Sequence, residues 1–285
     1  MDSGLPTGGA FLFDVRGLLA EEYADSQIWP AGGFLFTLVK KAERRLMKAA
    51  DAVIVLTERG RSLLQRWYAR ELSSKPLTVI PCCVDLRGAE LFQTVEPRAA
   101  ITIGYAGKLN GLYAAGDMIR FVAVADRVLK GVCFHIWTQS DPELARRYVT
   151  QEHEGANTTI GRLTPEEVVS HMRRTCDAGL AFIRPSFSKL ASSPTKIAEY
   201  LAAGLPVITN TGIGDLEEII CGERVGVVVT QFSDAAYCDA AAQLSSLLGD
   251  KTLRERCVAV ARKYFDLERI GWPRYRTVYE KLARA

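Results

Sequence analysis

One stretch of the sequence places a basic and an acidic side chain in the first turns of a predicted helix. It runs from Ser192 to Ile208 and reads SSPTKIAEYLAAGLPVI. A helix that opens near Pro194 directs free backbone amides and the positive end of its dipole outward, which suits a diphosphate. Lys196 adds a positive charge in the first turn, and Glu199 follows about one turn later. A carboxylate at that distance can accept hydrogen bonds from the two hydroxyls of a ribose.

The same residues also fit an ordinary amphipathic helix whose lysine and glutamate are solvated. The position of the helix bears on the choice, because open α/β sheets bind ligands outside the carboxyl ends of their strands. The sequence before the helix, DAGLAFI at 177–183, is an apolar run that predicts a strand. We therefore expect the helix to begin at the ligand-binding edge of a sheet.

Six short apolar runs alternate with helical patterns between residues 101 and 229. Continuous apolar strands joined by helices predict a parallel sheet covered on both faces, and six strands complete a doubly wound α/β domain. Thr164, Pro165 and Glu167 supply a cap, a first-position proline and a capping-box glutamate, while Gly204 ends the helix described above. The runs are ITIGYAG (101–107), VCFHIW (132–137), ANTTI (156–160), DAGLAFI (177–183), PVIT (206–209) and VGVVV (225–229).

The first 98 residues show only three strand patterns, at 10–15, 52–56 and 77–80. Three parallel strands leave an open sheet edge with unpaired backbone groups. This part therefore looks like the back half of a domain whose front is absent, and we expect a chain truncated at its N-terminus. Residues 87–99 carry no clear period and predict a linker. An amphipathic helix precedes the second strand, with apolar positions Leu38, Val39, Ala42, Leu46 and Ala49.

Composition and charge exclude several classes of protein. Lys plus Arg (36) nearly balance Asp plus Glu (33), which leaves a net charge of +3, too balanced to indicate nucleic-acid binding. No segment approaches about 18 uncharged apolar residues, and the first ten residues lack the pattern of a signal peptide. The seven cysteines form no Cys-x-x-Cys pair and mostly lie in apolar runs. We expect a cytoplasmic protein that contacts the inner face of a membrane at most peripherally.

The stretch from Ser192 to Ile208 resembles the sugar-nucleotide motif of the family 4 (group 1) glycosyltransferases. In that family the motif is Glu-x7-Glu, then small residues and Gly-x-Pro-Val-Ile. Glu199 matches the second glutamate, and the resemblance implies that it holds the ribose of the donor. Ala191 stands at the position of the first glutamate, which the family links with the donor sugar. This departure bears on the identity of the sugar and on retaining chemistry.

Other matches occur in the family's order. Residues 103–109 (IGYAGKL) look like the first strand and loop of its C-terminal domain, where a glycine admits the phosphates and a basic residue meets their charge. Residues 161–164 (GRLT) look like its base-recognition loop, and 212–215 (GIGD) resemble the loop after the motif. Turn glycines and an exposed arginine also occur without a ligand. The expected donor-binding residues are Gly107, Lys108, Arg162, Ser193, Thr195, Lys196 and Glu199.

The resemblance extends over the whole chain and implies its architecture. Residues 50–57 and 79–85 look like the closing strands of the family's N-terminal domain, and Trp272 opens a segment like the one that crosses back onto that domain. The implied fold is α/β, with two Rossmann-like doubly wound domains (the GT-B fold) of which the N-terminal one is incomplete. The expected boundaries are 1–98 for the partial acceptor-side domain, 99–265 for the nucleotide-sugar-binding domain and 266–285 for the returning helix.

Asp14 and Arg16 end the first predicted strand in the sequence Asp-Val-Arg-Gly, where many members of the family place a histidine. The chain looks like members that carry Asp-x-Arg-Gly there. We expect Arg16 to neutralise the departing nucleotide diphosphate and Asp14 to hold an acceptor hydroxyl. A structural pair at the end of a strand is the alternative.

These matches imply an enzyme that moves a sugar from a nucleotide diphosphate sugar to a hydroxyl of a carbohydrate or lipid-linked acceptor, with retention of configuration. No Asp-x-Asp motif is present, and His135, His153 and His171 have no carboxylate at ligand spacing. We therefore expect neither a metal nor a cofactor other than the donor itself.

Two other functions fit the same architecture. A nucleotide-sugar epimerase would show several catalytic carboxylates and a histidine around the donor, and it would convert the donor alone into an epimer. A non-catalytic binding or assembly module would bind nucleotide with neither transfer nor hydrolysis of the donor.

Overall fold

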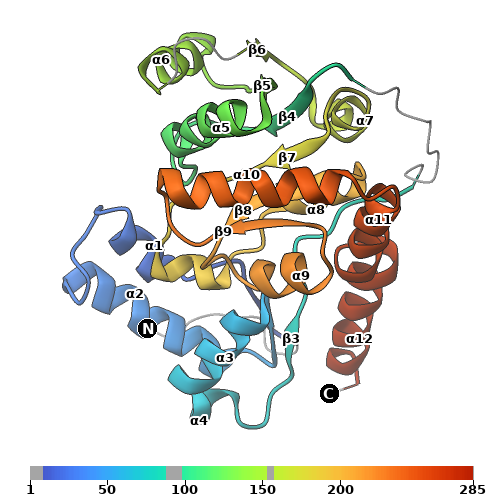
Figure 1. Ribbon diagram of the computed structural model, residues 1–285. Coiled ribbons are helices and arrows are strands. Elements are labelled where there is room, and N and C mark those ends of the chain that lie inside the picture. Colours follow the sequence, from blue (N-terminus) through green and yellow to red (C-terminus); the bar gives the residue numbers. More distant parts are fainter. Residues whose placement is uncertain (1–8, 88–97, 153–156, 285) are drawn as a thin grey trace.

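The computed structural model describes residues 9–87, 98–152 and 157–284, and these form two parallel sheets with helices packed on them (Figure 1). The strands are β1 (Leu12–Val15), β2 (Ala52–Val55), β3 (Leu77–Val79), β4 (Ile101–Ala106), β5 (Val132–Trp137), β6 (Asn157–Gly161), β7 (Ala178–Leu180), β8 (Val207–Asn210) and β9 (Gly226–Val229). The helices are α1 (Leu19–Asp25), α2 (Phe34–Ala49), α3 (Glu58–Trp67), α4 (Ala69–Leu72), α5 (Ala115–Leu129), α6 (Pro142–Glu152), α7 (Pro165–Thr175), the 3₁₀ helix η1 (Phe187–Ala191), α8 (Thr195–Ala202), α9 (Leu216–Gly222), α10 (Asp234–Leu248), α11 (Leu253–Tyr264), the π-helical turn η2 (Leu267–Gly271) and α12 (Trp272–Leu282).

The larger sheet contains the six strands predicted after residue 100. Their order is β6-β5-β4-β7-β8-β9 and all are parallel. Helices α5 and α10 pack on one face around Phe121 and Tyr237, and α8 and α11 on the other around Tyr200 and Cys257. The doubly wound α/β prediction is therefore confirmed. Because the strand order reverses between β4 and β7, their carboxyl ends border the expected ligand crevice.

The residues predicted to begin α7 and to end α8 do so in the structure. The amide of Thr164 donates a hydrogen bond to Glu167 Oε2 at 2.8 Å, and Pro165 is the first residue of α7. Gly204 follows α8 with φ +73°, a left-handed conformation that favours glycine at the end of a helix. β8 begins three residues later, so this turn sets the distance from α8 to the sheet.

The smaller sheet has the order β1-β2-β3, and among the described residues β1 has a neighbouring strand on one side only. One face packs against α3, and the other packs Ala52, Ile54 and Ile80 against Val278 of α12. Figure 1 shows α12 returning from the larger part to lie beside β3. The three predicted strands and the incomplete Rossmann-like arrangement are confirmed, while the domain boundaries stay a prediction.

Helix α2 forms as predicted, but the apolar positions of its sequence pattern do not face the interior. Leu38 is 52% exposed and Leu46 40% exposed, whereas Glu43 and Met47 are buried. The reason is a polar contact: Glu43 accepts a hydrogen bond from the hydroxyl of Tyr68 and pairs with Lys40.

This orientation turns the apolar stripe of α2 toward the open side of β1. Val39, Ala42 and Leu46 line a groove there together with Phe13 of β1. The amphipathic pattern alone predicted the helix correctly and its buried side wrongly, because that side is set by the contact of Glu43 with Tyr68, which lies outside the pattern.

Within the part of the chain that the structure describes, no helix is long and apolar enough to cross a membrane. Most of the predicted linker, residues 88–97, and His153 lie outside the described residues.

Gly226 at the start of β9 has no room for a side chain, which provides a test of the sheet. A Cβ there would lie 2.0 Å from the carbonyl oxygen of Val207 on β8. Because that backbone atom cannot move without disturbing the β8–β9 pairing, Gly226→Ala should lower the free energy of unfolding by about 1–3 kcal/mol in urea denaturation. Gly222→Ala, at the end of α9 with no atom within 4 Å, is the control and should not lower it. Equal stability of the two variants would contradict this pairing.

Candidate functional site

The start of α8 lies where the strand order of the larger sheet reverses. The chain leaves β7, passes through η1 and enters α8, and β7 neighbours β4. Pro194 precedes the first residue of α8, and no side chain caps the amides of its first turn. Uncapped amides and the helix dipole together favour a negatively charged group at this end of the helix.

The side chain of Lys196 is largely enclosed beside this turn. Its ammonium lies 4.6 Å from the centre of the Tyr113 ring and 5.6 Å from that of Tyr105. Among the described residues it has no hydrogen bond or ion pair, and its charge interacts with that of Glu199. Burial lowers the pKa of Lys196, and Glu199 offsets part of the shift. An ammonium with so little compensation favours the binding of an anion.

Gly107 lets the Lys196 ammonium lie against the backbone of the loop after β4. Gly107 has φ +146°, and a Cβ at this position would lie 2.0 Å from Lys196 Nζ. Its amide donates a hydrogen bond to the carbonyl of Trp137 at 2.8 Å, which holds the loop to the end of β5. The backbone of this loop thus approaches the Lys196 ammonium closely, which is the kind of approach that a glycine permits. Contact of Gly107 with phosphates stays a prediction.

Glu199 lies close enough to Lys196 and Tyr113 for its charge to interact with both. Its side chain is half-buried, and burial raises its pKa while the charge of Lys196 lowers it. Burial, and then the charge of Glu199, raise the pKa of Tyr113 to about 12. Among the described residues no hydrogen bond to the Glu199 carboxylate is found. The carboxylate is therefore available to accept hydrogen bonds from a ligand.

The other predicted donor-binding residues differ in their surroundings. Lys108, Arg162 and Thr195 are exposed. Lys108 and Arg162 both follow strands at the carboxyl edge of the sheet, with Arg162 two strands away from β4. Ser193 is engaged instead, because its Oγ accepts a hydrogen bond from the Cys82 amide at 3.2 Å. Ser193 thus joins the α8 region to the loop after β3.

Asp14 and Arg16 form a pair at the end of β1, with Arg16 Nη1 3.6 Å from Asp14 Oδ2. The hydroxyl of Tyr275 on α12 donates a hydrogen bond to the same Asp14 oxygen at 3.2 Å. Arg16 also reaches across to Cys82 Sγ at 3.7 Å. The second oxygen of Asp14 is buried without a hydrogen-bond partner among the described residues. The structural pair that the sequence left open is therefore present, and it borders the loop that contacts Ser193.

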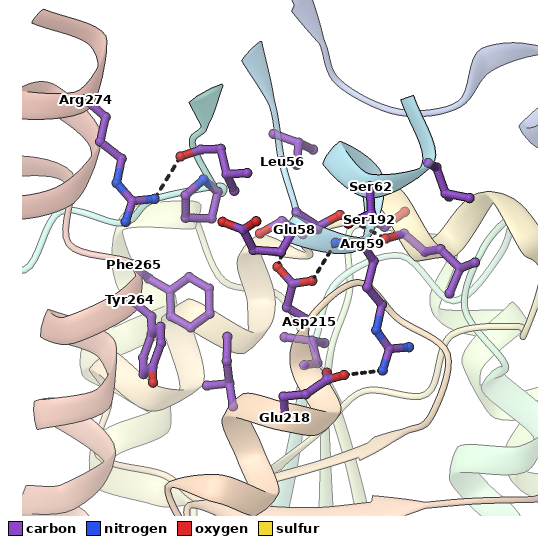
Figure 2. A pocket seen from close by; sticks show the side chains of 18 of the residues that line it. Leu56, Glu58, Arg59, Ser62, Ser192, Asp215, Glu218, Tyr264, Phe265 and Arg274 are labelled. Atoms are coloured by element: carbon purple, nitrogen blue, oxygen red, sulfur yellow. Dashed lines mark hydrogen bonds and ion pairs between the residues drawn. The ribbon is translucent and has the colours of Figure 1, made fainter. Parts of the chain in front are cut away.

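Asp215 joins the two sheets, a contact that the sequence analysis missed. Its carboxylate accepts hydrogen bonds from the amides of Glu58 at 2.7 Å and Arg59 at 3.1 Å, the first residues of α3. Arg59 also forms an ion pair with Glu218 of α9 (Figure 2). The only signals in the sequence are a strand end followed by a helix on one side and the loop 212–215 on the other.

These residues line a cavity of about 630 Å³ between the two parts of the chain. Tyr264, Phe265 and Arg274 lie on its opposite side (Figure 2). Its lining includes neither Lys196 nor Glu199. This cavity is therefore not the space beside the predicted phosphate and ribose residues.

Ala191, which stands where the family motif has its first glutamate, is buried between the two parts. It is 5% exposed and packs in the core of the smaller part. A Cβ on Gly60 of α3 would lie 3.2 Å from the Ala191 Cβ. The neighbouring carbonyl of Leu190 accepts a hydrogen bond from Thr57 Oγ1 at 2.9 Å. Position 191 is therefore an interface position in this chain.

Comparison with known proteins agrees with the fold. The sequence model of a family described as Glycosyl transferases group 1 matches residues 100–246, just over half of the chain. This segment contains all six strands of the larger sheet together with α8. No curated protein matches the sequence.

Several solved structures are similar to almost the whole chain. Sucrose-phosphate synthase from Thermosynechococcus elongatus has a TM-score of 0.70 at 19% identity, over 96% of this chain and 68% of its own. The pneumococcal O-GlcNAc transferase GtfA, in complex with UDP and GlcNAc, has a TM-score of 0.67 at 18% identity, over 97% of this chain and 53% of its own. An α,α-trehalose-phosphate synthase (UDP-forming) from Burkholderia vietnamiensis has a TM-score of 0.68 at 14% identity, over 98% of this chain and 68% of its own. At these identities the likeness concerns the fold, and the chain spans about half to two thirds of each of these proteins.

The buried position of Ala191 leads to a testable expectation. Ala191→Glu restores the family's residue, but it forces a charged side chain into the contact with α3. It should lower the free energy of unfolding by about 3–5 kcal/mol in urea denaturation, because the carboxylate would be buried without a partner. Thr195→Glu, four residues later on the exposed start of α8, is the control and should change stability by less than about 0.5 kcal/mol. A fully stable Ala191→Glu variant would show that position 191 is open to solvent.

Proposed function

The chain belongs to the group 1 glycosyl transferases, and we propose that it transfers a sugar from a nucleotide diphosphate sugar to a hydroxyl of an acceptor. One observation carries the proposal: Lys196 and Glu199, one turn apart on α8, lie close together beside the glycine loop after β4. A cation and uncapped amides suit a diphosphate, and a carboxylate without a protein partner suits a ribose.

The proposed roles follow from these positions. The α8 amides and Lys196 bind the diphosphate, and Lys108 adds charge from the loop after β4. Glu199 accepts hydrogen bonds from the ribose hydroxyls, and Arg162 lies beside the base at the end of β6. Ser193 and Thr195 complete the start of α8, although the hydroxyl of Ser193 also accepts from Cys82.

In the proposed reaction the bond between the anomeric carbon and the diphosphate oxygen breaks. The acceptor oxygen forms a bond to that carbon and gives up its proton to the departing diphosphate. The departing diphosphate is the group that gains negative charge, so positioned cations and amides lower the barrier most. Lys196, Lys108 and the α8 amides supply that stabilisation without a metal, and Arg16 contributes from the smaller part. We further propose retention of configuration, as the family resemblance implies.

The acceptor is assigned to the smaller part of the chain, where Asp14 and Arg16 line a hollow beside β1. A carbohydrate or a lipid-linked sugar would offer the hydroxyl. The bound UDP named for the pneumococcal transferase and the UDP-forming reaction named for the trehalose-phosphate synthase support UDP sugars as the first donors to test.

Glu199→Ala tests the ribose assignment. Loss of the charge-assisted hydrogen bonds should weaken binding of UDP or GDP, whichever the native chain binds, by roughly 2–3 kcal/mol, or about 30- to 150-fold, in calorimetric titration. Glu166→Ala, on the exposed start of α7, is the matched control and should leave the affinity unchanged. An unchanged affinity in Glu199→Ala would remove Glu199 from the site.

The pKa shifts predict how nucleotide binding depends on pH. Burial raises the pKa of Glu199 above its ordinary 4.5, so the carboxylate is lost as an acceptor earlier as the pH falls. Burial lowers the pKa of Lys196 below its ordinary 10.5, so its charge is lost earlier as the pH rises. When the affinity for the nucleotide diphosphate is measured from about pH 5 to pH 10, it should therefore fall toward both the acid and the alkaline end of that range.

Two variants isolate the two limbs of that profile. Glu199→Gln should flatten the acid limb except for the titration of the ligand's own phosphate, with pKa about 6, which all the proteins share. Lys196→Met should flatten the alkaline limb. Profiles of the same shape for both variants and the native chain would contradict the assignment.

A further inference from the structure

The site as described lacks a carboxylate for the sugar of the donor. Lys196 and Glu199 serve the diphosphate and the ribose, and position 191 is an alanine buried against α3. A sugar ring presents several hydroxyls, and carboxylates are strong acceptors for them. A replacement acid must reach the start of α8 from elsewhere in the fold.

Glu22 of α1 is held at this place by a buried lysine. Lys189 lies on η1, and its side chain is 4% exposed. Its ammonium is 3.3 Å from Glu22 Oε1, whose side chain is 34% exposed. Because a buried ammonium needs a counter-charge, Lys189 fixes the carboxylate of the smaller part against the segment that leads into α8. Among the described residues the second oxygen, Glu22 Oε2, has no hydrogen-bond partner.

A series of contacts connects Glu22 with the segment that leads into α8. The Glu22 carboxylate lies against Gly17, where a Cβ would be 3.0 Å from Oε1. The preceding residue, Arg16, contacts Cys82 Sγ at 3.7 Å, and the Cys82 amide binds Ser193 Oγ at 3.2 Å. Ser193 is four residues after Lys189, which pairs with Glu22.

Glu22 also shares a hollow with the residues assigned to the reaction. A cavity of about 350 Å³ is lined by Glu22 together with Asp14, Arg16 and Gly17. A carboxylate oxygen without a partner in that hollow is placed to accept hydrogen bonds from a substrate that also meets Arg16.

We propose that Glu22, held by Lys189, binds hydroxyls of the donor's sugar and takes the role of the glutamate missing at position 191. The inference rests on the proposed function, because it concerns the sugar of the same donor. It assigns sugar recognition to the smaller part of the chain and nucleotide recognition to the larger part.

The test compares a nucleotide diphosphate with its sugar ester. Calorimetry gives the affinities of UDP and GDP, and of UDP-glucose, UDP-N-acetylglucosamine and GDP-mannose, for the native chain and for Glu22→Gln. Loss of the charged acceptor should weaken the nucleotide sugar that the native chain binds by about tenfold or more, and the free nucleotide by less than about twofold. Glu22→Asp keeps the charge beside Lys189 but withdraws the carboxylate by one methylene, and it should show the same selective loss.

Asp25→Asn is the matched control. Asp25 lies on the same helix and accepts a hydrogen bond from the Ser188 amide on η1 at 2.8 Å, which an asparagine oxygen also accepts. Its affinities for nucleotide and nucleotide sugar should both equal those of the native chain. The inference is overturned if Glu22→Gln weakens both ligands equally, weakens neither, or matches Asp25→Asn. If the native chain binds no nucleotide at all, the proposed function is overturned and the inference with it.

Discussion

A buried ammonium group loses its hydration, and the larger part of the chain is arranged around that loss at Lys196. The rings of Tyr105 and Tyr113 and the charge of Glu199 compensate it incompletely. The loop after β4 carries glycine at 107 because any side chain there would occupy the place of the ammonium. The uncapped turn of α8 adds positive potential rather than relieving it. These elements at the reversal point together favour a negatively charged occupant.

The two parts of the chain meet through polar contacts made by backbone amides and single carboxylates. Asp215 accepts from the first amides of α3, Ser193 accepts from Cys82, and Lys189 pairs with Glu22. Such contacts are specific in direction, because each needs one donor and one acceptor in register. Close packing supports them: a Cβ on Gly214 would lie 2.8 Å from Thr57 Cγ2 of the smaller part. The junction thus combines directional hydrogen bonds with tight packing.

The sequence predicted the nine strands of the described residues, the capping of α7 and the position of α8, because these features depend on local periodicity and on short motifs. It also predicted that Lys196 and Glu199 lie on one helix that begins at the carboxyl ends of the strands. It did not predict which side of α2 is buried, since that depends on Glu43 meeting Tyr68. Nor did it reveal the contact of Asp215 with α3, whose partners lie 156 and 157 residues away. A pattern within one segment carries no information about a partner so distant.

The replacement of glutamate by alanine at position 191 has consequences beyond one ligand contact. With a small side chain there, η1 lies against α3 close to Gly60, and Lys189 becomes buried. A buried lysine requires an anion, and the nearest carboxylate that satisfies it, Glu22, comes from the smaller part. The acid that we propose for the sugar is therefore held in place only when the two parts are in contact, whereas Lys196 and Glu199 both stand on α8 in the larger part. The proposed recognition of the sugar thus depends on the junction, and the closeness of Lys196 to Glu199 does not.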